Sequence, residues 1–202
     1  MIDAAFAIPG DINAPTGGYA YDRKVLALLP DFGVTAHRVE LPASFPYPSE
    51  SDLARTRHLL AQVAPETVTL IDGLAFGAMP PETVNAIRQP IIGLVHHPLA
   101  YETGISSVVE RQFRAFESHA LSRAQHVVVS SSTTAALLKR EFGVPQAAIT
   151  VAPPGTPPSI RAQGSGGMSF VELLAVGTLV PRKGYGDLID ALERIKELHW
   201  RL

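Results

Sequence analysis

The chain has 202 residues, of which 46% are hydrophobic and 18% are charged, and its formal net charge is -2 at pH 7. This length and composition suit one sizeable α/β core, or one domain and a piece of another. A net charge so close to zero gives no basic surface for a polyphosphate backbone, so we expect no nucleic-acid partner. The chain has no cysteine, which excludes a disulfide framework and thiolate metal ligands.

The N-terminal residues lack the basic segment and the apolar core of a signal peptide. No stretch approaches ~20 uninterrupted apolar residues, the length that a membrane-spanning helix needs. We therefore expect a cytoplasmic protein without a transmembrane segment.

Apolar runs alternate with segments of helical periodicity over the first three quarters of the chain, which predicts a parallel α/β sheet of the Rossmann-like kind. The expected strands cover residues 2–8, 34–41, 68–71, 91–98, 126–130 and 149–151. The expected helices cover residues 19–29, 51–63, 81–87, 105–121 and 131–142. The polar residues that begin the last of these helices are expected to cap it.

A glycine-containing loop, residues 10–18, follows the first expected strand and leads into a helix. Gly17 and Gly18 have no Cβ, so a ligand can approach the backbone where the helix begins. The spacing differs from GxGxxG, which disfavours a nicotinamide or flavin enzyme. A plain turn is the alternative interpretation.

Two adjacent histidines, His96 and His97, end the expected strand 91–98. Consecutive strand residues point to opposite faces, so we expect one of them to face the ligand end of the sheet. An imidazole there can orient a substrate or stabilise developing charge. A pair of structural histidines that bond loop carbonyls is the alternative, and the lack of a third ligand nearby in the sequence leads us to expect no metal.

The neighbouring sequence predicts a role for three further acidic residues. Glu102, in the loop after the histidines, is a candidate for binding substrate hydroxyls, with a solvated loop carboxylate as the alternative. Asp72 precedes a glycine and is expected to be a turn or helix-cap residue. Glu117, like Arg111 and Arg114, is expected on the solvated face of the helix 105–121.

Residues 156–168 are rich in Pro, Gly and Ser and lack periodicity, which is typical of an interdomain linker. We therefore expect one domain over residues 1–155 and the first βα unit of another over residues 169–202. A single βα unit cannot form an independent core, because domains rarely have fewer than ~50 residues. Three interpretations are open: the unit packs on the first domain, it pairs with another chain, or the chain is a fragment that lacks most of its second domain. We favour the fragment, with self-association through the incomplete unit as an option.

The expected βα unit places a basic loop between an apolar run, residues 170–176, and a helix that continues to the C-terminus. A helix that begins after a strand presents free backbone N–H groups to an anion. Arg182 and Lys183 add a planar cation and a mobile one, which together suit a diphosphate. An ordinary solvated turn is the alternative.

The segment VGTLVPRKGYGDLIDAL, residues 176–192, resembles the first strand, loop and helix of the nucleotide-binding domain in retaining family 4 glycosyltransferases. These are glycogen-synthase-like enzymes with two facing Rossmann-type domains, the GT-B architecture. The resemblance implies that Lys183 contacts the donor diphosphate. An arginine usually follows the motif's first glycine and makes a second contact, but this chain has Thr178 there, which leaves Arg182 as the substitute.

Two other segments carry the same resemblance. PTGGYAYDRKVLALL, residues 15–29, resembles the family's glycine-rich loop, which implies that Gly17 and Gly18 lie against the acceptor and the donor phosphates. GLVHHPLAYE, residues 93–102, resembles the strand that ends in a histidine touching the transferred sugar. This role falls on His96, with His97 as the alternative.

The resemblance implies a metal-independent transferase that moves a sugar from a nucleotide diphosphate-sugar to an acceptor hydroxyl, with retention and without a cofactor. Residues 1–155 then form the acceptor-side domain, and residues 169–202 begin the domain that binds the nucleotide sugar. Because most of that second domain is missing, we expect weak transferase activity at most from these 202 residues alone. A non-catalytic binding module of the same fold and a nucleotide-sugar epimerase are the alternatives.

Overall fold

The computed structural model describes residues 2–177 and 179–202, without the side chain of Arg182. It divides into two compact units, which are described separately. The first unit comprises Met1–Glu102 and Ser106–Pro154, and the second comprises Thr103–Ile105 and Gly155–Leu202. The assignment of these parts to an acceptor-side and a donor-side domain stays a prediction.

A six-stranded sheet forms the centre of the first unit, with the strand order β2-β1-β3-β4-β5-β6. Its strands are β1 (Ile2–Pro9), β2 (Val34–Leu41), β3 (Val68–Asp72), β4 (Ile91–Val95), β5 (His126–Val129) and β6 (Ile149–Val151). All five pairings are parallel. The prediction of a Rossmann-like α/β fold is confirmed, and the fold is consistent with the N-terminal domain of a GT-B protein.

The strand order reverses direction between β1 and β3. Beyond β1 the chain first adds β2 on one side and then returns to add β3 on the other. In open α/β sheets, ligands bind outside the carboxyl ends of the strands at such a switch point. In this chain those ends are Pro9 of β1 and Asp72 of β3.

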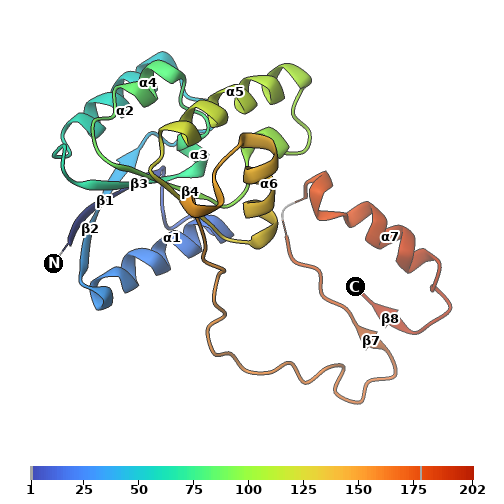
Figure 1. The fold of residues 1–202 in the computed structure, drawn as a ribbon. Helices are drawn as coiled ribbons and strands as arrows, with labels where there is room; N and C mark the ends of the chain where they lie inside the picture. Colours follow the sequence, from blue (N-terminus) through green and yellow to red (C-terminus); the bar gives the residue numbers. More distant parts are fainter. Residues whose placement is uncertain (1, 178) are drawn as a thin grey trace. The chain divides into compact units, whose positions relative to one another are not determined.

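Helices cover both faces of the sheet (Figure 1). They are α1 (Gly17–Leu28), α2 (Glu50–Ala61), α3 (Gly73–Phe76), α4 (Pro81–Asn85), α5 (Ser107–Arg123) and α6 (Ser132–Phe142), with the short 3-10 helices η1 (Leu29–Phe32), η2 (Leu99–Tyr101) and η3 (Gln146–Ala148). Neighbouring strand residues pack on opposite sides, because Leu94 contacts the core under α1 whereas Val95 contacts the core under α5 and α6. The site residues of α1 therefore approach the sheet from one face only.

Side-chain caps explain where several helices begin. Ser49 and Asp52 form a capping box at the start of α2. Ser131 Oγ accepts from the backbone N–H of Thr134 at 3.1 Å, so the predicted capping role at the start of α6 is confirmed. Ser106 caps α5 in the same way. Each such cap contributes about 1 kcal/mol to helix stability.

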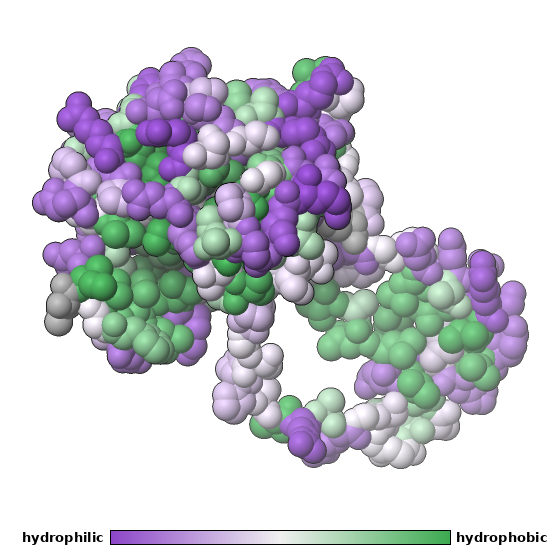
Figure 2. Space-filling model, viewed as in Figure 1, coloured by the Kyte–Doolittle hydropathy of each residue, from purple (hydrophilic) through white to green (hydrophobic). Residues whose placement is uncertain are grey.

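An apolar cavity of about 490 Å³ lies beside α1 in the first unit. Its lining comes from the strands β1 to β5 and from α1, and includes Phe6, Val25 and Leu94. Hydrophobic side chains are visible at the surface over α1 (Figure 2). Asp22, Asp72 and His96 are absent from this lining, so the cavity and the polar site described below are different features.

The second unit contains β7 (Val171–Glu172), η4 (Pro181–Lys183), α7 (Tyr185–Glu193) and β8 (Trp200–Arg201). The predicted strand 170–176 is wrong in length, because its partner β8 has only two residues and the ladder ends with it. The predicted helix is also too long: it stops at Glu193, and β8 turns the expected βα unit into a β-α-β arrangement.

The second unit leaves much apolar surface uncovered. Hydrophobic side chains spread over its visible face (Figure 2), and Leu174 and Val176 are 88% and 85% exposed. Among its described residues, Leu192 is the one hydrophobic side chain that is buried. A two-stranded sheet with one helix offers too little surface to bury the others.

Candidate functional site

The site begins with α1, which starts directly after the glycine loop. Thr16 caps the helix, because its Oγ1 accepts from the backbone N–H of Tyr19 at 3.2 Å. Tyr19 in turn donates from its hydroxyl to the carbonyl of Pro9 at 2.7 Å, which ties α1 to the end of β1. Asp22 lies one turn into this helix and is fully buried.

Asp72 ends β3 and caps the short helix α3. Its Oδ1 accepts from the backbone N–H of Leu74 at 2.8 Å, which confirms the predicted capping role. The side chain is buried, with 4% of its surface exposed. Its second carboxylate oxygen, Oδ2, faces the end of the neighbouring strand β4.

His96 follows directly after β4 and faces both carboxylates. Its Nε2 lies 3.1 Å from Asp22 Oδ1 and 3.7 Å from Asp72 Oδ2. The Tyr21 ring packs edge-on against the imidazole with 5.2 Å between ring centroids. The His96 side chain keeps 25% of its surface exposed, so a substrate can reach it from solvent.

The backbone of His96 is also fixed by hydrogen bonds. Its carbonyl accepts from Ser130 Oγ at 3.3 Å and from Thr134 Oγ1 at 3.4 Å. A Cβ added at Gly18 would lie 3.4 Å from His96 Cδ2, so the start of α1 runs directly beside the ring. The imidazole is therefore fixed by contacts from α1, β3 and the segment after β5.

The buried carboxylates change the acid-base behaviour of the site. Burial, with a further contribution from the charge of Asp22, raises the pKa of Asp72 to about 7. Burial acts to lower the pKa of His96, but the hydrogen bond to Asp22 and the charges of Asp22 and Asp72 outweigh it and raise that pKa. The Nε2 proton is therefore held more tightly than in an ordinary histidine.

Asp22, Asp72 and His96 each offer one ligand atom, and these atoms lie within 4.8 Å of one another. Asp22 Oδ2 is buried without a hydrogen-bond partner among the described residues. The 3.1 Å separation of Nε2 and Asp22 Oδ1 is within hydrogen-bonding distance.

The sequence pattern of Glycosyltransferase Family 4 matches residues 14–159, which is more than half of the chain. The chain belongs to Glycosyltransferase Family 4. The matched region includes Asp22, Asp72 and His96 and every strand of the large sheet except β1. No curated protein sequence matches the chain. None of the described helices is long and apolar enough to cross a membrane.

The other site residues predicted for the first unit of this family 4 chain are Gly17, His97 and Glu102. Gly17 begins α1, and a Cβ added there would meet nothing within 4 Å. His97 Nε2 lies 3.1 Å from the carbonyl of Tyr101, so its ring bonds the loop and not the carboxylates. Glu102 is half-buried and ends η2, where its backbone N–H donates to the Leu99 carbonyl at 3.1 Å.

The predicted diphosphate residues of the family 4 chain belong to the second unit. Lys183 ends η4 and is exposed. Gly184 follows with φ of 66°, a conformation that glycine adopts without strain, and α7 begins directly after it. The Tyr185 hydroxyl donates to the Gly177 carbonyl at 3.1 Å and closes the loop. Thr178 and the side chain of Arg182 lie outside the described residues.

Sequence analysis of the family 4 domain missed that two acidic residues, Asp22 and Glu117, are buried. Asp22 has a recognisable signal, because it stands three and four residues before Val25 and Leu26 in the apolar stripe of α1. Glu117 was placed on the solvated face of α5, and this prediction is wrong, because the residue is only 4% exposed. It shares its stripe with Phe113 and Leu121, both buried.

Proposed function

We propose that this chain is the acceptor-side part of a retaining glycosyltransferase that moves a sugar from a nucleotide diphosphate-sugar to an acceptor hydroxyl. The observation that carries the proposal is His96, held by two buried carboxylates at the carboxyl ends of the parallel strands, inside the region matched by the family. The fold locates this cluster beside the topological switch point, where α/β sheets bind ligands.

His96 is the residue that orients the transferred sugar in this proposal. Its Nε2 is engaged by Asp22 and Asp72, which leaves Nδ1 to bind a sugar hydroxyl. A ring held on several sides loses little further freedom when it binds the substrate, and such positioning lowers the barrier to reaction.

The donor diphosphate is assigned to the second unit and to the glycine loop. Lys183 is an exposed cation one residue before the glycine that precedes α7, and backbone N–H groups at a helix start favour an anion. Gly17 and Gly18 leave the start of α1 open to close approach. Cations and backbone amides stabilise the leaving diphosphate, so the proposed reaction needs neither a metal nor a cofactor.

Product analysis tests the proposal. The purified protein is incubated with a panel of nucleotide diphosphate-sugars and small acceptor alcohols, and release of nucleoside diphosphate and the anomeric configuration of the product are followed by NMR. We expect transfer with retention, and we expect His96→Ala to abolish it while His58→Ala, a histidine on the outer surface of α2, leaves it unchanged. An inverted product overturns the retaining assignment. Undiminished transfer by the His96→Ala variant overturns the role of the cluster.

A further inference from the structure

The short helix η2 begins three residues after His96, and two side chains of α5 hold it. Its residues are Leu99, Ala100 and Tyr101. Only His97 and Pro98 lie between η2 and His96. Because this connection is so short, a movement of η2 also moves His96.

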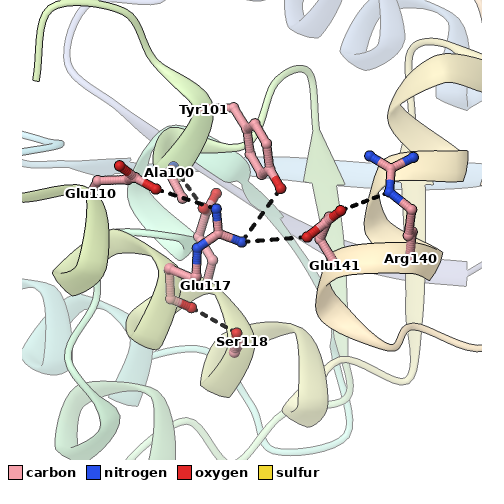
Figure 3. Close-up of polar contacts among 8 residues, drawn as sticks. Ala100, Tyr101, Glu110, Glu117, Ser118, Arg140 and Glu141 are labelled. Carbon is pink, nitrogen blue, oxygen red and sulfur yellow. Dashed lines mark hydrogen bonds and ion pairs between the residues drawn. The ribbon is translucent and has the colours of Figure 1, made fainter. Parts of the chain in front are cut away.

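Glu117 holds the start of η2 with both oxygens of its carboxylate. Oε1 accepts from the backbone N–H of Leu99 at 2.7 Å. Oε2 accepts from the backbone N–H of Ala100 at 2.9 Å (Figure 3). The residue is 4% exposed. A carboxylate is costly to bury unless its oxygens are satisfied, and here two backbone donors satisfy it.

Glu117 also packs against the segment that carries Asp72. A Cβ added at Gly77, directly after α3, would lie 2.7 Å from Glu117 Cγ. The helix α3 is capped by Asp72 at its other end. One buried side chain therefore contacts both the segment after His96 and the helix that Asp72 begins.

Arg114, one turn before Glu117 on α5, holds the other end of η2. Its guanidinium lies 5.0 Å from the centroid of the Tyr101 ring, and its Nη1 donates to the Tyr101 hydroxyl at 3.4 Å. Ion pairs to Glu110 and Glu141 at 3.4 Å and 3.9 Å orient the guanidinium. The dashed contacts around Tyr101 and Glu141 can be followed in Figure 3.

We propose that Glu117 is a positioning residue for His96: its bidentate contact to η2 and its packing on Gly77 set the position of the imidazole relative to Asp22 and Asp72. Arg114 holds the other end of η2 at Tyr101, and Glu117 and Arg114 together are called the clamp. The effect on sugar transfer rests on the proposed function, whereas the effect on the His96 ring does not.

Substitution Glu117→Gln tests the proposal with almost no change in shape. The amide oxygen can accept one of the two backbone hydrogen bonds, but the amide nitrogen faces the other N–H and cannot accept from it. Gln89→Ala is the matched control, because Gln89 is also buried and its side chain also bonds to backbone: Nε2 donates to the carbonyls of Leu60 and Val63, and Oε1 accepts from the N–H of Arg88. Gln89 precedes the amino end of β4, away from η2.

The readouts are amide hydrogen exchange of Leu99 and Ala100, the His96 ring resonances at one fixed pH, and the denaturation midpoint. We expect Glu117→Gln to speed the exchange of these two amides about tenfold or more and to shift the ring resonances. Gln89→Ala should lower the midpoint without moving the ring resonances. Unchanged His96 resonances in a destabilised Glu117→Gln variant overturn the proposal, because they show a purely structural role.

A second variant covers the case in which Glu117→Gln does not fold. Arg114→Ala removes a partly exposed side chain and releases the Tyr101 end of the clamp, so we expect a smaller shift of the same ring resonances. Identical spectra overturn the clamp. If sugar transfer is also measurable, we expect kcat to fall about tenfold in Glu117→Gln with little change in KM. If only the transfer assay fails, the proposed function is contradicted. The NMR result then still decides whether the clamp positions His96.

Discussion

Asp22 Oδ1 and His96 Nε2 lie 3.1 Å apart although 74 residues separate the two side chains in the sequence. The contact joins α1, which covers one face of the sheet, to the carboxyl end of β4. It buries a carboxylate completely and gives the imidazole a fixed orientation.

Substitution Asp22→Asn removes the charge and keeps the shape of the side chain. Since the hydrogen bond and the charge of Asp22 raise the pKa of His96, we expect that pKa to fall in the variant and transfer activity to fall about 100-fold, the order of effect of a positioned acid or base. NMR titration of His96 and initial rates measure the two effects. Asp31→Asn, in the exposed helix η1, should change neither. An unaltered pKa of His96 in the Asp22→Asn variant would show that Asp22 does not influence the protonation of the imidazole.

The unfolding free energy should depend on pH through Glu117. Burial raises the pKa of this carboxyl to about 7 from 4.5, so between these values the folded state holds a proton that the unfolded state releases. Its contribution to stability is therefore fully present below pH ~4.5 and falls as the pH rises to ~7, by up to roughly 3 kcal/mol.

Urea denaturation at several pH values between 4.5 and 7.5 measures this slope. Glu117→Gln removes the titrating group, so the variant should lose less stability than the parent across that window. Glu141→Gln serves as the control, because hydrogen bonding to Arg140 lowers the pKa of Glu141 from its usual value of 4.5. Its contribution therefore changes below this window, and we expect the pH profile of this variant to run parallel to that of the parent. Parallel pH profiles for the parent and Glu117→Gln would contradict the burial of an elevated-pKa acid.

A larger side chain at Gly18 should disturb His96, and one at Gly17 should not. A Cβ at Gly18 already reaches van der Waals contact with the imidazole at 3.4 Å, whereas one at Gly17 meets nothing within 4 Å. Both positions lie in the first turn of α1, so the intrinsic helix cost of valine is matched. We expect Gly18→Val to shift the His96 ring resonances and to lower transfer about tenfold, and we expect Gly17→Val to leave the ring resonances unchanged. Equal effects of the two variants would count against the approach of α1 to the ring.

Lys183→Ala should weaken binding of nucleoside diphosphates. Lys183 is exposed in η4, and loss of a charge-assisted contact to phosphate costs about 1.5–3 kcal/mol, or roughly 10- to 100-fold in Kd. Isothermal titration with a nucleoside diphosphate provides the measurement. Lys196→Ala, an exposed lysine after α7, controls for a general loss of positive charge. Equal affinity of the parent and Lys183→Ala would remove this residue from the donor site.

Most elements of the first unit could be predicted because their causes are local. The apolar runs of β1 to β6 and the caps at Ser106 and Ser131 act over a few residues, and the structure places nearly all of these elements within two or three residues of the predicted bounds. The second unit was predicted less well. A strand exists only where another strand pairs with it, and the short partner β8 limits β7 to two residues.

The residues of the candidate site could likewise be predicted only in part. His96 and the capping role of Asp72 follow from their places after apolar strands. The predicted strand 91–98 is too long, because β4 ends at Val95. Both histidines lie beyond it, so the alternation of strand side chains does not decide which of them faces the carboxylates. The sequence also determined the α/β class, through the spacing of its apolar runs, and a likeness to family 4 glycosyltransferases.

Only the tertiary structure decided which buried acids surround that histidine. Asp22 and Glu117 look like ordinary polar positions of amphipathic helices. The cost of burying them is offset in part by partners elsewhere in the chain: His96 for Asp22, and the N–H groups of Leu99 and Ala100 for Glu117. The free energy of a buried charge depends on the groups that surround it in space, and the fold alone brings those groups together.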